Sequence, residues 1–118
     1  MAETAQAQQP QASADEIGAL PVWDLSDLYP GIDAPEVGAD LDRAAAEAAE
    51  FEAQYKGSLA ALAAADDGGA RLAEAIAGYE RISELLGRLM SYAGLVYAGD
   101  TSDPVRSKFY GDLQDRAT

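Results

Sequence analysis

Two long stretches of this chain repeat apolar residues every three or four positions, which is the spacing of one face of an α-helix. The first stretch covers residues 34–56 and the second covers residues 70–98. Gly57 and the sequence DDGG at residues 66–69 lie between them, and both favour the end of a helix and a turn. Because helices joined by a short connection pack side by side in opposite directions, we expect an antiparallel helical hairpin.

The first helix has a clear start signal. Asp33 is placed to cap it, Pro35 suits a first turn, and Glu36 favours the positive end of the helix dipole. Glu52 and Lys56 are four positions apart, in the favoured order for an ion pair. The apolar stripe of this helix consists of Val37, Leu41, Ala44, Ala48, Phe51 and Tyr55.

The second helix carries two adjacent apolar stripes, which together form a wide apolar face. One stripe consists of Leu72, Ile76, Tyr79, Leu86, Met90, Ala93 and Tyr97. The other consists of Ile82, Leu85, Leu89, Tyr92 and Val96. A face this wide contacts more than one neighbour, and its tyrosines Tyr79, Tyr92 and Tyr97 either pack in the core or line a peptide groove. Glu84 and Arg88 are spaced for a surface ion pair.

Two shorter helices complete the expected fold. SLAALAAA at residues 58–65 suits a short helix, and the sequence DTSDP at residues 100–104 ends one helix and starts another. In that third helix Val105, Phe109 and Leu113 repeat every four residues. Residues 1–19 show no period and are expected to be a disordered leader. The expected fold is therefore all-α, with antiparallel long helices as a hairpin plus a third helix.

The composition excludes several classes of function. The net charge of −13 argues against binding to nucleic acids and anionic membranes, since both select clustered Lys and Arg. The chain has no histidine and no cysteine, so HExxH zinc sites, Ser-His-Asp catalysis and disulfides are excluded. No residue of the chain qualifies as catalytic or metal-binding. The leader lacks a basic start and an apolar run, so it is not a secretory signal and we expect a cytoplasmic protein.

Residues 21–31, PVWDLSDLYPG, hold the only tryptophan of the chain. Asp24 and Asp27 are spaced to cap a short helical turn over residues 24–29. On such a turn the large apolar side chains share one side, so we expect them to anchor the segment to the helices. These expected anchor residues are Trp23, Leu25, Leu28 and Tyr29.

The motif WDLSDLY at residues 23–29 resembles the start of the oligoendopeptidase F family, which are zinc metallopeptidases related to thimet oligopeptidase. DAPE at residues 33–36 and the long Ala/Glu-rich helix that follows are similar as well. The sequence YERISELLGRLMSYA at residues 79–93 resembles the second long N-terminal helix of that family. The resemblance covers residues 20–118. Its motif residues are Trp23, Asp24, Leu25, Asp27, Leu28 and Tyr29.

The resemblance implies that residues 20–118 are the N-terminal helical region of a longer endopeptidase that hydrolyses short peptides and that continues beyond Thr118. In the family the HExxH motif lies in the C-terminal part, and none of it maps onto this chain. The chain alone is therefore expected to be inactive and to lack zinc, with the catalytic part as its partner. Its helices would form part of the wall of a peptide channel.

Two other interpretations remain at this stage. The chain could be a free-standing acidic helical module that binds a partner through an exposed apolar face. It could also be an acidic mimic that binds a basic protein.

Overall fold

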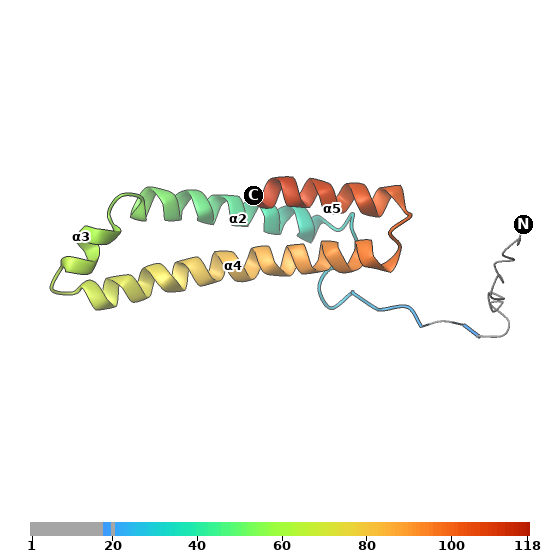
Figure 1. The fold of residues 1–118 in the computed structure, drawn as a ribbon, viewed down its shortest axis with the longest axis horizontal. Helices are drawn as coiled ribbons and strands as arrows, with labels where there is room; N and C mark the ends of the chain where they lie inside the picture. The colour runs from blue at the N-terminus through green and yellow to red at the C-terminus, as the bar shows by residue number, and fades with distance from the viewer. Residues whose placement is uncertain (1–17, 20) are drawn as a thin grey trace, which may run out of the picture.

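The computed structural model describes residues 18–19 and 21–118, and this part of the chain is all-α, as predicted (Figure 1). The expected disordered leader, residues 1–19, lies outside the described residues except for Gly18 and Ala19. The helices are α2 (Pro35–Tyr55), α3 (Leu59–Ala64), α4 (Gly68–Gly99) and α5 (Pro104–Ala117).

The long helices α2 and α4 run in opposite directions and are joined at one end by α3 (Figure 1). Helix α5 turns back at the other end and packs along the C-terminal half of α4, close to the start of α2. The predicted hairpin and third helix are confirmed. The helix ends lie within one or two residues of the expected positions.

Most buried residues of α4 lie along one seam with spacings of three, four or seven, and Ala93 of the first predicted stripe is buried beside it. The seam follows the second predicted stripe and is extended toward α3 by the small residues Ala75 and Gly78. Phe51 of α2 lies over Gly78, where an added Cβ atom would be 3.4 Å from its ring. Ile76 and Tyr79 of the first stripe therefore lie outside the seam and are 57% and 62% exposed.

The buried residues form two clusters of unequal size. The larger, which we call the main core, joins the segment before α2 to α2, α4 and α5. It consists of Tyr29, Val37, Leu41, Leu89, Tyr92, Ala93, Val96 and Leu113. The smaller cluster joins α2, α3 and α4 at the other end of the hairpin and consists of Tyr55, Leu62 and Ala75.

Tyr29 holds the N-terminal segment against the main core. Its hydroxyl donates a hydrogen bond to Asp40 Oδ2 at 2.7 Å. Its ring centroid lies 5.1 Å from that of Tyr92. The Arg88 guanidinium lies over the Tyr29 ring at 4.8 Å and donates to the Leu28 carbonyl at 2.6 Å. Arg88 thus reaches across to this segment, and the expected ion pair with Glu84 is replaced by these contacts.

The expectation that Trp23 anchors the segment is wrong, because its side chain is 90% exposed. The short turn capped by Asp24 is present. Asp24 Oδ1 accepts a hydrogen bond from the Ser26 amide at 2.9 Å, and the Leu25 carbonyl accepts from the Leu28 and Tyr29 amides at 3.0 and 3.4 Å. Trp23 precedes this turn and does not pack with Tyr29 against the main core. Leu25 and Leu28 are half-buried against the main core, and Asp27 is exposed.

The two helices that begin with proline start in different ways. Helix α5 is capped by Asp103, whose side chain accepts a hydrogen bond from the Val105 amide at 2.8 Å. The expected cap of α2 by Asp33 is wrong, because Ala34 occupies the cap position and no side chain bonds there. In α5, Val105 is exposed, whereas its predicted stripe partners Phe109 and Leu113 pack against the main core.

The first turn of α4 approaches the end of α3 so closely that only glycine fits at position 68. An added Cβ atom would lie 2.6 Å from the Ala63 carbonyl oxygen and 2.7 Å from that of Leu62. We expect Gly68→Ala to lower the free energy of unfolding by about 1–3 kcal/mol, because the backbone must shift. Gly69→Ala is the matched control, since nothing lies within 4 Å of its added Cβ atom. It should be neutral or stabilising by up to about 1 kcal/mol. Equal urea midpoints for the two variants would contradict the close approach.

Candidate functional site

A large groove lies where the N-terminal segment crosses the turn between α4 and α5. Its volume is about 900 Å³, within the range of roughly 300–1,000 Å³ that is usual for ligand pockets. We call it the tryptophan groove. Its apolar lining consists of Pro21, Val22, Trp23, Leu25, Leu95, Val96 and Val105.

Four of these side chains are exposed although they are large and apolar, namely Val22, Trp23, Leu95 and Val105. They come from three separate elements: the extended segment before α2, the end of α4 and the start of α5. Single exposed apolar side chains are ordinary, but a group of them around one groove is typical of an interaction site.

The polar rim of the tryptophan groove is acidic. It holds Asp24, Asp100, Asp103 and Arg106. Arg106 is engaged within the protein, because its Nε lies 3.5 Å from Asp103 Oδ2 and it also donates to the Val96 carbonyl at 3.1 Å. Hydrogen bonds from the side chain and backbone of Ser26 lower the pKa of Asp24. Hydrogen bonds from the side chain and backbone of Ser102 likewise lower the pKa of Asp100. Both carboxyl groups are therefore ionised at neutral pH.

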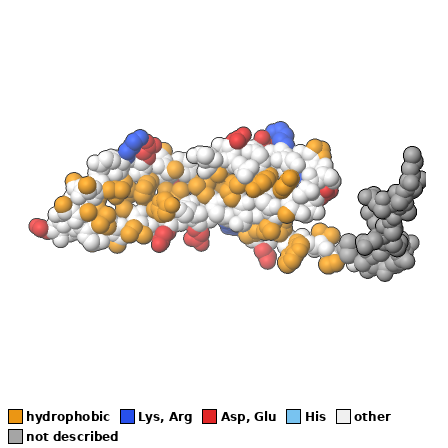
Figure 2. Space-filling view, viewed as in Figure 1, with side chains coloured by type: hydrophobic (Ala, Val, Ile, Leu, Met, Phe, Trp, Pro, Cys, Tyr) orange, Lys and Arg blue, Asp and Glu red, His pale blue; other side chains and the backbone are white. Residues whose placement is uncertain are grey.

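A second apolar surface lies on the part of the hairpin that α5 does not cover. In α4, Leu72, Ile76 and Tyr79 follow the helical spacing of Met90 and Tyr97, so all five share one side of the helix. Tyr97 of this set stacks on Tyr110 of α5, with ring centroids 5.3 Å apart. We call the part that α5 does not cover, with Leu72, Ile76 and Tyr79, the hairpin face. In Figure 2 apolar side chains gather between α2 and α4 over the half of the molecule that ends in α3.

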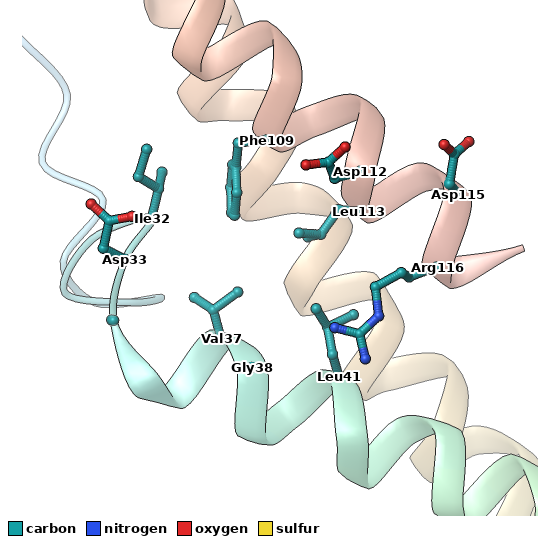
Figure 3. Close-up of a pocket in the computed structure, with 11 residues that line it drawn as sticks. Ile32, Asp33, Val37, Gly38, Leu41, Phe109, Asp112, Leu113, Asp115 and Arg116 are labelled. Atoms are coloured by element: carbon teal, nitrogen blue, oxygen red, sulfur yellow. The ribbon is translucent and has the colours of Figure 1, made fainter.

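A second, smaller groove of about 560 Å³ separates the start of α2 from the end of α5 (Figure 3). Its floor is formed by Val37, Leu41 and Leu113. These three side chains are buried members of the main core, so little apolar surface is open here. Arg116 at its rim donates to Asp42 of α2 at 3.0 Å.

The three tyrosines that were candidates for a peptide groove are not brought together. Tyr92 is buried in the main core. Tyr97 is half-buried against Tyr110. Tyr79 is exposed at the hairpin face, with its ring centroid 6.4 Å from that of Phe51.

Sequence reasoning missed the tryptophan groove because it expected Trp23 to anchor its segment to the helices and placed Val105 in the apolar repeat of the third helix. One signal was present, since Leu95 belongs to neither apolar stripe of its helix and therefore faces away from both neighbours. Arg88 and Asp40 were missed as partners of Tyr29 because they lie in distant elements and no local spacing links them.

Residues 18–19 and 21–118 contain no group of three or more His, Cys, Asp and Glu side chains that could hold a metal ion. No helix in the described residues is both long enough and apolar enough to cross a membrane. The HExxH motif of the resembled family cannot be formed by this chain, because it has no histidine.

Comparison of the chain with models of protein families, with curated proteins and with solved structures found no match in any of the three.

Proposed function

We propose that this chain is the N-terminal, non-catalytic helical part of a zinc metalloendopeptidase of the oligoendopeptidase F type, which hydrolyses short peptides. The proposal rests on the WDLSDLY motif at residues 23–29, the DAPE sequence at residues 33–36 and the order of long helices that follows. We further propose the cytoplasm as its compartment, on the character of its leader.

The observation that carries the proposal is the open hairpin face. Ile76 and Tyr79 expose more than half of their side chains on a helix whose other half is covered on the same side by α5. Such a face is expected of a module that packs against further polypeptide, since burying it stabilises the assembly by about 25 cal/mol per Å² of apolar surface. The further polypeptide in this proposal is the catalytic part.

The residues of this chain do not fit the zinc site of that family, so no catalytic step is assigned to them. Their role is structural. The α2–α4 hairpin supplies a wall, Tyr29 fixes the N-terminal segment to it through Asp40 and Tyr92, and the hairpin face receives the catalytic part.

A second candidate function is a free-standing acidic interaction module. The 90% exposure of Trp23 beside other apolar side chains favours it. Under this interpretation the tryptophan groove binds a separate protein, and no peptidase is involved.

The test is to read the coding DNA beyond Thr118 and to express the full open frame. We expect a downstream HExxH motif, zinc-dependent hydrolysis of a short peptide by the long product, and none by residues 1–118. In the long product, Ile76→Ser should destabilise through loss of a buried contact, whereas Leu59→Ser in α3 serves as the exposed control. A stop codon after Thr118, or hydrolysis by the isolated chain, would refute the proposal.

A further inference from the structure

Trp23 lies at the mouth of the tryptophan groove in a setting that suits recognition. The extended segment 21–25 presents its side chain beside Leu95 of α4 and Val105 of α5. Tyr29, a few residues along, is fixed by Asp40, Arg88 and Tyr92, so the segment is held in place from its C-terminal side. Tryptophan is strongly enriched among the contacts that dominate protein interfaces, and the segment that carries Trp23 is tethered at Tyr29.

The charges around the tryptophan groove indicate which kind of ligand it can bind. Asp24 and Asp100 are ionised and face solvent, whereas the one basic group of the lining, Arg106, is engaged by Asp103 and the Val96 carbonyl. An occupant with lysine or arginine next to apolar side chains complements this rim. A cation placed over the Trp23 ring gains a further attraction from the face of the indole.

We propose that the tryptophan groove binds a polypeptide segment that carries aliphatic side chains and flanking lysine or arginine residues, with Trp23 as its central contact. This inference does not depend on the proposed peptidase function, because it uses only the groove and its charges.

Two other occupants fit the charges less well. A second copy of this chain would bring the same acidic rim, and each copy carries a net charge of −13, so the two would repel. A bilayer with anionic lipids would be repelled for the same reason. A cationic peptide segment is attracted by both features.

Trp23 is the only tryptophan of the chain, so its fluorescence reports on this groove alone. Residues 1–118 are titrated with two synthetic peptides of equal length and equal leucine content, one with lysine and one with glutamate at the polar positions. The Leu/Lys peptide should saturate and shift Trp23 emission to shorter wavelength, and the Leu/Glu peptide should bind at least about tenfold more weakly. Added salt should weaken the first complex, because its rim charges are exposed.

Two variants test whether the peptide binds at Trp23 and whether a loss of affinity is caused by a loss of folding. Trp23→Ala should weaken the Leu/Lys peptide at least about tenfold by calorimetry. Leu59→Ala is the matched control, since Leu59 is also exposed but lies in α3 at the opposite end. Both variants should keep the parent Tm, because the side chains they remove make few contacts. Asp24→Asn combined with Asp100→Asn should reduce the preference for lysine over glutamate.

Several results would overturn the proposal. They are no binding of either peptide at millimolar concentration, equal affinity for both peptides, and unchanged affinity in Trp23→Ala. An emission shift on adding phosphatidylcholine vesicles would assign the groove to lipid, and a shift that depends on protein concentration alone would assign it to self-association. None of these results bears on whether a peptidase frame follows Thr118.

Discussion

Leu89→Ala is expected to lower the free energy of unfolding by about 2–5 kcal/mol, the range for removal of a buried leucine side chain. Leu89 is fully buried, and it is the largest side chain in that state among the described residues. It lies in the seam of α4 within the main core, to which α2, α5 and the N-terminal segment also contribute. Because no single neighbour can fill the space from all these directions, a cavity remains.

Thermal and urea unfolding followed by circular dichroism would measure this loss. Domains of this size have a total stability of about 5–15 kcal/mol, so the variant should lose a large fraction of it. Leu95→Ala is the control on the same helix, because Leu95 is half exposed and its removal should change stability by no more than about 0.5 kcal/mol. Similar losses for the two variants would contradict the assignment of the seam.

Tyr29→Ala is expected to lower the free energy of unfolding by about 3–5 kcal/mol and to release the N-terminal segment from the helices. The change removes the ring that packs against Tyr92 and lies under Arg88, and it leaves Asp40 without its hydroxyl partner. Fluorescence anisotropy of Trp23 would report the release as a gain in mobility at temperatures where the helices remain folded. Unchanged anisotropy would show that other contacts hold the segment.

Tyr29→Phe separates the hydroxyl from the ring. Burial, with the Asp40 carboxylate as a second cause, raises the pKa of Tyr29 to about 12. An unfolded tyrosine loses its proton near pH 10, whereas folded Tyr29 keeps it to about 12. The stability supplied by neutral Tyr29 is therefore complete below pH 10 and is lost as the pH rises toward 12. Tyr29→Phe should lack this part of the alkaline loss, while the contribution of buried Tyr92 remains in both proteins. Parallel stability curves of the two proteins between pH 9 and 12 would contradict the burial of the Tyr29 hydroxyl and its hydrogen bond to Asp40.

The helices of this chain were predictable because their signals are local. Spacing of apolar residues, Pro104 after Asp103, and Gly57 after Tyr55 each act within one or two turns, and the observed helix ends follow them. Gly57 adopts a positive φ of 75°, which glycine tolerates and other residues rarely adopt.

Which side chains of α4 and of the N-terminal segment are buried was less predictable. Both apolar stripes of α4 satisfy helical spacing, and hydrophobicity alone favours the one with Ile76 and Tyr79. In the half of α4 near α3 the buried positions are the small residues Ala75 and Gly78, and Phe51 of α2 packs over Gly78. In the other half, residues of both stripes are buried. The capped turn after Asp24 was predictable from its local signal, but the position of Trp23 was not, because Trp23 precedes the turn and is 90% exposed.

The unequal clusters at the two ends of the hairpin imply a gradient of local opening along one molecule. Amide protons in the α4 turns beside Leu89 and Tyr92 should exchange with solvent only when the whole domain unfolds. Those near α3 depend on three buried residues, Tyr55, Leu62 and Ala75, and should exchange through smaller, more frequent fluctuations. The end that carries α3 can therefore adjust its shape to a neighbour, while the end that holds the main core keeps a fixed geometry.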